Sequence, residues 1–457
     1  MKDEDIAAFA TGMRGSVIRP GDPAYDDARK LYNGMIDKRP AIIARCADVA
    51  DVIAAVNFAR ENKLPTAIRG GGHNGPGFGG VDDGLVIDLS MMKGVRVDPK
   101  NRTVRVGPGC TTGDVDHATH AFGQAVPFGI ISTTGVAGLT LSGGHGYLSR
   151  QYGLAVDNLI EADVVLADGR FITTSETENP DLLWALRGGG GNFGVVTSFL
   201  FRTHDAKMLY GGPIIFDIAD AADVMRWYRD FQSRAPEDFY IFLGLQSVPA
   251  GAPFPEEYWN RQMCVLLVAH NGEGGEAAVN AIRAELPKPI IDWAAPISYT
   301  GLQTLFDALY PSGLQWYWKG DFVQTLPDAA IDAHLLHASK ASPSSCMHLY
   351  PIDGAVHRRG KGDSAWNTRD ATWSMVIAAI DPDPAMAPAL KEWATQYWQA
   401  VHPFDLGGAY PNFMMDDEGE GRLQATYGDN YKRLAELKGK FDPTNMFRVN
   451  QNIRPAV

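Results

Sequence analysis

The sequence predicts an α+β protein in which a region of glycine-rich loops precedes a region built on an antiparallel sheet. Three observations predict this arrangement. Helix and strand patterns alternate in a βαβ order between residues 40 and 110. Glycine-rich segments recur as far as Gly194 and stop near residue 208. From 214 to about 400, strands and helices alternate without a βαβ rhythm, which is typical of an antiparallel sheet covered by helices.

The composition is that of a large globular protein. Of the 457 residues, 45% are hydrophobic and 21% charged, which allows two or three domains and an enclosed cofactor. The net charge of −13 disfavours a nucleic acid or an anionic membrane as main partner. The acidic start and the lack of a run of about 18 apolar residues indicate a soluble, cytoplasmic protein. Oligomeric state is left open.

The four cysteines are far apart and form no CxxC motif. This spacing favours buried thiols over a disulfide framework or a zinc site, so we expect no metal. They are Cys46, Cys110, Cys264 and Cys346.

Local patterns predict the elements of the first region. Asp48 is placed to cap a helix whose apolar residues follow i, i+3, i+4, i+7 spacing and which ends near Pro65. A strand at 66–68 then runs directly into a glycine loop. Further strands are expected at 84–89, 95–97, 104–106, 162–166, 171–174 and 195–202, and a helix at 180–187.

The second region has its own set of expected elements. Strands are expected at 239–245, 263–269, 314–323, 347–352 and 371–379, and helices at 219–231, 276–285, 328–339 and 385–401. In the strand 314–323, Trp316 and Trp318 share one face, while Tyr317 and Lys319 share the other. Either face can line a substrate cavity, and ordinary core packing is an equally open interpretation.

The loop Arg69-Gly-Gly-Gly-His-Asn74 carries the strongest chemical signal. Three consecutive glycines after a strand let the backbone turn sharply and present its N–H groups to a pyrophosphate. No GK[ST] follows, so the loop is not a P-loop, and Gly75-Pro76-Gly77 does not open the helix that a nicotinamide-binding Rossmann motif needs. From the glycines alone, a plain tight turn stays open.

The motifs taken in order resemble the FAD-linked oxidases of the vanillyl-alcohol oxidase superfamily, in the berberine-bridge-enzyme-like branch and its smaller bacterial type. The matching segments are RGGGHN (69–74), GLVIDLSMMKGVRVD (84–98), TTGVAGLTLSGGHG (133–146), YGLAVDN (152–158), ALRGGGGNFGVVT (185–197), YPN (410–412), YGDNYKRL (427–434) and FDPTNMFRVNQNI (441–453). The resemblance implies a PCMH-type FAD-binding domain made of residues 1–207 and 410–457, with a substrate-binding domain inserted at 208–409.

The resemblance also implies how FAD is held. The loop at 69–74 wraps the pyrophosphate, and His73 bonds covalently to the 8α carbon of the flavin; a histidine that only hydrogen-bonds the cofactor is the alternative. Ile131 stands where many relatives carry a second linking cysteine, which implies a single covalent bond. For each single contact a structural role stays open. The implied FAD contacts are Arg69, Gly70, Gly71, Gly72, His73, Asn74, Ser132, Thr133, Thr134, Gly135, Gly138, Gly144, Gly146, Asp157, Asn158, Gly194, Val196, Asn412, Asn450 and Gln451.

The implied activity is oxidation of a small organic molecule, a secondary metabolite or a carbohydrate. Hydride leaves an alcohol or amine carbon for FAD, and O2 reoxidises the flavin to give hydrogen peroxide. Plant relatives place proton-accepting residues where this chain has Gly75 and Phe413. The remaining candidates for the base are Tyr410, Tyr317 and His357, with Tyr410 favoured by its motif. An enzyme without a base, a dehydrogenase with another acceptor, and a flavin-binding protein without turnover stay open.

Overall fold

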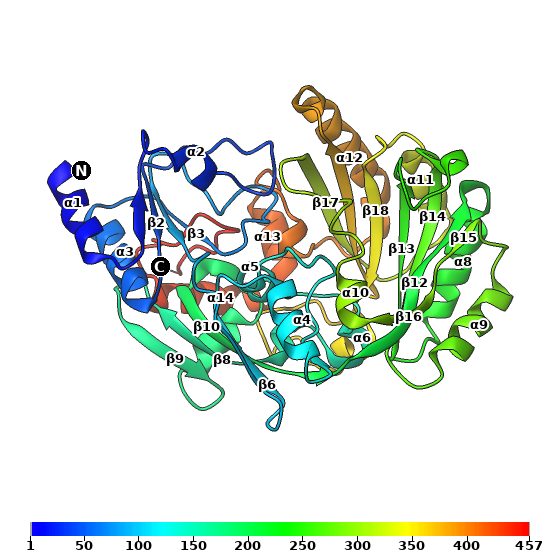
Figure 1. Ribbon diagram of the computed structural model, residues 1–457, viewed down its shortest axis with the longest axis horizontal. Helices are drawn as coiled ribbons and strands as arrows, with labels where there is room; N and C mark the ends of the chain where they lie inside the picture. Colours follow the sequence, from blue (N-terminus) through cyan, green and yellow to red (C-terminus); the bar gives the residue numbers. More distant parts are fainter. Residues whose placement is uncertain (1, 457) are drawn as a thin grey trace.

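The computed structural model describes residues 2–456 (Figure 1). The N-terminal part of the chain forms a four-stranded sheet. Its order is β1 (Ser16–Ile18), β2 (Ile42–Arg45), β4 (Leu85–Asp88) and β3 (Thr66–Arg69), and β2 and β3 both run parallel to β4. Helix α3 (Val49–Glu61) connects β2 to β3, and the Asp48 carboxylate accepts hydrogen bonds from two N–H groups of its first turn. The predicted βαβ start is confirmed. Helices α1 (Asp3–Gly12) and α2 (Tyr25–Ala28) precede it.

A five-stranded antiparallel sheet follows. Its order is β5 (Val95–Asp98), β6 (Thr103–Val106), β10 (Val195–Arg202), β8 (Leu159–Val165) and β9 (Phe171–Ser175). The predicted hairpin of β5 and β6 and the predicted bounds of β10 are confirmed. Shorter elements lie between these strands, namely α4 (Thr112–His120), β7 (Gln124–Ala125), α5 (Val136–Leu141), α6 (Ser149–Tyr152), α7 (Pro180–Leu186) and β11 (His204–Asp205).

The large sheet of the second region is antiparallel throughout, as predicted. Its order is β15 (Ile291–Asp292), β12 (Met208–Asp217), β14 (Gln262–His270), β13 (Phe239–Ser247), β18 (Cys346–Pro351), β19 (Trp373–Asp381) and β17 (Gln315–Val323), and β16 (Ala295–Ser298) also pairs with β12. Helices α8 (Ala221–Gln232), α9 (Gly275–Glu285), α11 (Asp328–Ala338) and α12 (Ala387–Val401) cover the outer face (Figure 1), and α10 (Tyr299–Gln303) lies near α4. The other face is turned towards the glycine-rich loops.

One long strand of this sheet was not predicted. Strand β12 contains Gly211, Gly212 and Pro213, which interrupt the alternating apolar pattern that identifies a strand. The structure accommodates them because β12 pairs with β14 on one side and with the short strands β15 and β16 on the other.

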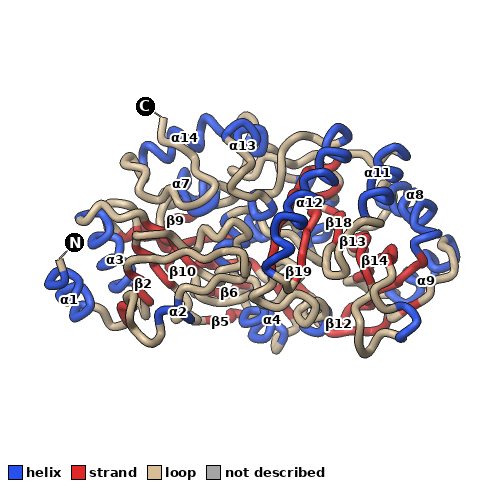
Figure 2. Tube along the Cα trace, turned by 90° about the horizontal axis from the view of Figure 1, so that it is seen from above, coloured by secondary structure: helices blue, strands red, loops and turns tan. Residues whose placement is uncertain are grey.

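The end of the chain returns to the first region. Helix α14 (Asn430–Phe441) lies beside α7, and α13 (Glu420–Tyr427) packs against α14, as seen from above in Figure 2. The fully buried Lys438 ammonium bonds to the Asp442 carboxylate at 2.7 Å and to the carbonyl oxygens of Asn192 and Phe447. This buried pair joins α14 to the glycine loop at 188–194. The domain boundaries at 207/208 and 409/410 stay predictions.

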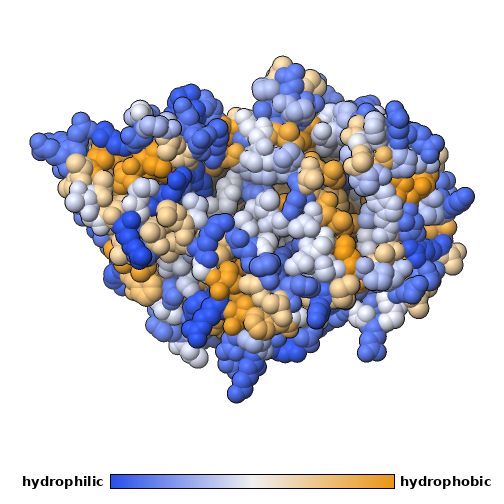
Figure 3. Space-filling view, in the orientation of Figure 1, coloured by the Kyte–Doolittle hydropathy of each residue, from blue (hydrophilic) through white to orange (hydrophobic). Residues whose placement is uncertain are grey.

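Hydrophilic residues dominate the face in Figure 3, with apolar patches scattered among them. Over residues 2–456, none of the helices has both the length and the apolar character that crossing a membrane requires.

Candidate active site

A cavity of about 330 Å³ lies between the glycine-rich loops and the open face of the large sheet. Three parts of the chain that are distant in sequence line it. From the loops come residues 69–74, 129–131, 134–135, 137–139 and 190–192; from the large sheet come Trp316, Trp318, Cys346, His348, Tyr350, Val376 and Ala378; from the tail come residues 410–413 and 449–451. The cavity therefore has a loop end and a sheet end, and we keep these two names below.

Glycines at the loop end let two backbones touch. A Cβ atom at Gly71 would lie 2.6 Å from the N and Cα atoms of Gly135, and one at Gly135 would lie 2.4 Å from the Gly71 N. These glycines are needed because a side chain at either would separate the loops. Gly138 and Gly191 also line the cavity, yet a Cβ on either would meet no protein atom within 4 Å. Their bare backbone leaves room for a ligand.

His73 follows these glycines and faces the same cavity. Its ring stacks on Tyr32 with the ring centroids 3.9 Å apart and the planes inclined by 19°. Burial lowers the pKa of His73 to about 4, against the opposing effect of a backbone hydrogen bond with Thr133. The imidazole is therefore neutral at physiological pH, and one ring nitrogen keeps the free lone pair that bond formation to a carbon atom requires.

Arg69 is a charged residue at the loop end, and its charge is balanced. Its guanidinium lies 2.9 Å from the Asp88 carboxylate, and both side chains are buried. The two residues are direct neighbours on the parallel strands β3 and β4. This ion pair fixes the point at which β3 ends and the glycine loop begins.

Tyr410 brings a hydroxyl group to the cavity from the tail. Its oxygen accepts hydrogen bonds from the Gly144 N–H at 3.1 Å and from the Asn412 side-chain amide at 2.7 Å. Its ring packs against His145 and Phe413, with centroid distances of 4.7 and 4.9 Å. Burial raises the pKa of Tyr410 to about 12, although both donors favour the phenolate.

Two family models match the N-terminal and C-terminal parts of this chain, and relatives match nearly its whole length. Residues 40–175 match the FAD binding domain model, and residues 409–454 match the model described as berberine and berberine like. An FAD-linked oxidoreductase of Dictyostelium discoideum is 31% identical, over 98% of this chain and 97% of the relative. The chain belongs to the berberine-bridge-enzyme-like branch of the vanillyl-alcohol oxidase superfamily. It is an FAD-dependent oxidoreductase.

Other members of the family support the same assignment. The (R)-6-hydroxynicotine oxidase of Paenarthrobacter nicotinovorans is 30% identical, and the match covers 98% of each chain. The structure of 6-hydroxy-D-nicotine oxidase from Arthrobacter nicotinovorans aligns with a TM-score of 0.87 at 26% identity, over 97% of this chain and 98% of that one. The berberine-bridge-enzyme-like protein 1 of Physcomitrella patens aligns at 0.88 and 25% identity, over 99% of each chain. The PCMH-type fold predicted from the motifs is therefore confirmed.

Most of the residues predicted to contact FAD line this cavity. They are Arg69, Gly70, Gly71, Gly72, His73, Asn74, Thr134, Gly135, Gly138, Gly194, Val196, Asn412, Asn450 and Gln451. That they contact FAD stays a prediction.

Six residues predicted to contact FAD lie outside the lining. Thr133 lines a neighbouring cavity behind the loop at 70–73, and Ser132 donates to the Asp307 carboxylate. Gly144 donates to Tyr410, and Gly146 donates to Ser149. The other two serve local structure: Asp157 pairs with Arg369 at 2.8 Å, and the Asn158 amide donates to the carbonyl oxygens of Tyr152 and Leu154.

Two of the three candidate bases are not brought to the cavity. Tyr317 points to the helix-covered face of the sheet, where its hydroxyl donates to the Asp417 carboxylate at 2.9 Å. His357 lies in the short helix Gly354–Arg358 and bonds to the Ala371 carbonyl oxygen at 2.8 Å. Tyr410 alone among the three lines the cavity. Of the two faces of β17, the one with Trp316 and Trp318 is the one that lines it.

Aromatic rings fill the space at Gly75 and Phe413, the two positions where the resemblance led us to look for a proton acceptor. A Cβ at Gly75 would lie 2.3 Å from the Trp318 ring, so the indole fills the space above this glycine. Phe413 packs edge-on against Tyr410. Neither position therefore offers a proton acceptor to the cavity.

Sequence reasoning missed three polar side chains of the cavity. His145, His348 and Tyr350 are all buried and line it. His348 and Tyr350 alternate with Cys346 on one face of β18, so polar residues at every second position of a buried strand were the available signal.

Proposed function

We propose that this protein is an FAD-dependent oxidase that takes a hydride from an alcohol or amine carbon of a small organic molecule and passes the electrons to O2, giving hydrogen peroxide. The observation that carries the proposal is the single cavity with a glycine-built end and an aromatic end. Relatives named (R)-6-hydroxynicotine oxidase and chitooligosaccharide oxidase, at 30% and 29% identity, support an oxidase acting on a small molecule.

The loop end fits a bound dinucleotide. Gly138 and Gly191 leave open space beside the backbone, and Gly71 and Gly135 hold the two loops together. When bound, FAD supplies the hydride acceptor. The loop at 69–74 would hold its phosphates through backbone N–H groups, with Asn450 and Gln451 closing the site from the tail.

His73 is the residue that we propose to bond covalently to the flavin. Its ring is held by the stack on Tyr32 and is neutral at physiological pH, so its position and lone pair suit attachment. Ile131 lines the same cavity, and this side chain has no atom able to form a second bond. A single linkage is therefore part of the proposal.

Tyr410 is the proposed proton acceptor for the substrate hydroxyl or amine. The two hydrogen bonds to its oxygen stabilise the phenolate, and Asn412 and Gly144 fix the direction of the phenol. The proton that Tyr410 takes up restores its neutral form. A pKa of about 12 keeps Tyr410 protonated at neutral pH, so proton acceptance depends strongly on pH.

The test is turnover by the purified flavin-loaded protein with (R)-6-hydroxynicotine, chitobiose, benzyl alcohol and benzylamine. We expect that one of these probes bleaches the flavin without air and that air then restores the colour with release of peroxide. A flavin that is bleached but stays reduced in air would contradict the oxidase and indicate a dehydrogenase. A flavin that dithionite reduces and no probe bleaches would indicate binding without turnover.

A further inference from the structure

Tyr32 covers one face of the His73 imidazole at the loop end of the cavity. The two ring centroids lie 3.9 Å apart and the ring planes are inclined by 19°, which is a stacked arrangement. Both side chains line the cavity. Because the lone pair of an imidazole nitrogen lies in the plane of the ring, fixing this plane also fixes the direction in which His73 can form a bond.

Tyr32 is itself held by its backbone and by its hydroxyl group. Its N–H donates to the Gly72 carbonyl oxygen at 3.1 Å, and its own carbonyl oxygen accepts from the Gly313 N–H at 2.9 Å. The hydroxyl donates to the Tyr310 carbonyl oxygen at 2.6 Å. Burial raises the pKa of Tyr32, so this hydroxyl stays protonated and remains a donor. The phenol therefore cannot turn away from His73 without breaking its bond to Tyr310.

The backbone at Thr133 gives the imidazole a second support. The hydrogen bond between His73 and this backbone raises the pKa of the ring, as expected where the imidazole N–H donates to a carbonyl oxygen. The other ring nitrogen then keeps its lone pair. The Asp307 carboxylate accepts from the Ser132 N–H at 3.0 Å and from the Ser132 hydroxyl, which holds the backbone directly before Thr133.

One segment of the second region contributes to both supports, because Asp307, Tyr310 and Gly313 lie in the stretch that leads into β17. This stretch is far from His73 in the sequence. The orientation of the imidazole is therefore set by the second region as well as by the glycine loop that contains it.

Bond formation at His73 places a demand on these supports. As one ring nitrogen forms a bond to the flavin 8α carbon, a C–H bond of that carbon breaks and its proton leaves to solvent. The electron pair of the broken bond passes to the bound cofactor and then to O2, which gives hydrogen peroxide. The imidazole carries a positive charge until its remaining N–H loses a proton. An aromatic face beside the ring and a carbonyl oxygen on its N–H both stabilise this charge.

We propose that Tyr32 is a positioning residue for the covalent attachment of FAD, whose ring holds the His73 imidazole in the plane of bond formation and stabilises the positive charge that develops on it. This inference rests on the proposed function, because it requires the bond from His73 to FAD. It adds a residue outside the glycine loop to the machinery of attachment.

The rate of attachment tests this role without any substrate. Protein produced in riboflavin-starved cells is mixed with excess FAD, and samples are denatured in acid at successive times. The flavin that stays with the polypeptide gives the rate of attachment, and the quenching of flavin fluorescence on mixing gives the affinity for FAD before attachment. Tyr32→Leu removes the aromatic ring, whereas Tyr32→Phe keeps the ring and removes only the hydroxyl.

A second tyrosine–histidine stack in this protein provides a matched control. Tyr152 stacks on His204 with the ring centroids 4.1 Å apart and the planes inclined by 11°, and both residues lie outside the cavity lining. Tyr152→Leu removes the same kind of contact at a distance from His73. Its rate of attachment should equal that of the wild type.

We expect Tyr32→Leu to take up FAD and to attach it at least about tenfold more slowly than the wild type at saturating FAD. Tyr32→Phe should restore most of the rate, because the stacked ring is retained. An unchanged rate in Tyr32→Leu would overturn the inference, and so would equal slowing in Tyr32→Phe or in Tyr152→Leu.

Two further outcomes are distinct. A Tyr32→Leu protein that takes up no FAD would overturn the inference, because Tyr32 would then hold the cofactor and not the histidine. A wild-type polypeptide that loses all its flavin in acid would instead contradict the covalent bond of the proposed function. If Tyr32→Leu does not fold, Tyr32→Met removes the ring while filling more of its space, and the same outcomes apply.

Discussion

The two ends of the cavity are built from different parts of the polypeptide. The loop end consists of main chain: Gly71 and Gly135 touch backbone to backbone, and Gly138 has open space beside it. The sheet end consists of side chains that alternate along β17, β18 and β19, such as Trp318 and Tyr350. If the loop end holds the cofactor, as we propose, then substitutions at the sheet end should change the substrate and leave cofactor binding intact.

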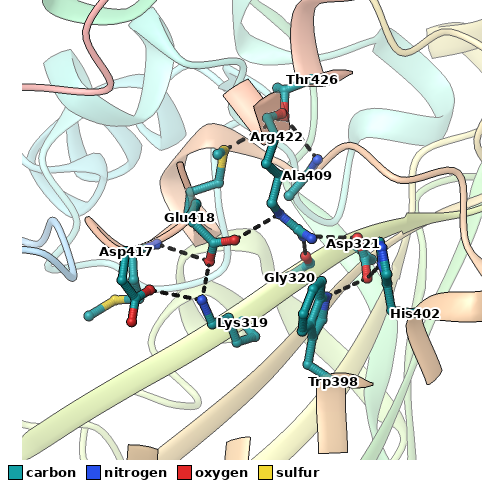
Figure 4. Close-up of polar contacts among 12 residues, drawn as sticks. Lys319, Gly320, Asp321, Trp398, His402, Ala409, Asp417, Glu418, Arg422 and Thr426 are labelled. Carbon is teal, nitrogen blue, oxygen red and sulfur yellow. Dashed lines mark hydrogen bonds and ion pairs between the residues drawn. The ribbon is translucent and has the colours of Figure 1, made fainter. Parts of the chain in front are cut away.

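Two buried lysines, Lys438 beside the glycine loop at 188–194 and Lys319 on the outer face of β17 (Figure 4), should differ most in how much each stabilises the protein. Lys438 pairs with the single carboxylate of Asp442 in a fully buried site, so Lys438→Met leaves that charge without a cation and should cost about 3–5 kcal/mol of unfolding free energy. Lys319→Met should cost less, because Lys391 and Arg422 still neutralise Asp417 and Glu418. Urea unfolding measures both variants, and an equal loss would break the comparison.

Removing the Tyr410 hydroxyl, which reaches the cavity from the tail, should change the rate of flavin reduction and leave the flavin bound. Tyr410→Phe should slow flavin reduction by about 10²–10⁴-fold. Because the pKa of Tyr410 is raised to about 12, the deprotonated fraction grows with pH, and the wild-type rate should rise roughly tenfold per pH unit between 7 and 10. Stopped-flow reduction without air gives both quantities. A pH-dependence that persists in Tyr410→Phe would assign the proton to another group.

Substitution by alanine should distinguish two kinds of glycine at the loop end, those that hold two loops in contact and those beside open space. Gly71→Ala places a Cβ against the Gly135 backbone and should lower the stability of the flavin-free protein by about 1–3 kcal/mol. Gly138→Ala meets no protein atom and lies in helix α5, so the flavin-free protein should be no less stable, while FAD binding weakens. The measurements are urea unfolding and flavin content, and a destabilised Gly138→Ala variant would argue against a ligand beside that backbone.

The smallest expected effect concerns the sheet end alone. Trp318→Phe shortens a ring that lines the sheet end and should weaken substrate binding by about 0.5–1.5 kcal/mol through lost ring packing, with flavin content unchanged. Trp227→Phe is the matched control, because its indole N–H bonds to Glu285 on an exposed helix face, away from the cavity. Loss of flavin in Trp318→Phe would show that the two ends are not independent.

The same contrast explains what the sequence could predict. The loop end is local, since a strand, three glycines and a histidine follow one another at 66–73, and Asp48 marks the preceding helix. The sheet end depends on pairing between distant strands. Alternation predicts that Trp316 and Trp318 share a face. Which face of β17 meets the loops is set by packing against α12, and Tyr317 therefore lies on the face away from the cavity.

The central claim is that the glycine loops hold FAD and deliver its ring to His73. Acid denaturation of the purified protein, followed by an absorbance spectrum of the washed polypeptide, tests this claim most directly. We predict that yellow colour stays with the wild-type polypeptide and leaves that of His73→Ala. A colourless protein that takes up no FAD on reconstitution, or a His73→Ala polypeptide that keeps its colour, would contradict it.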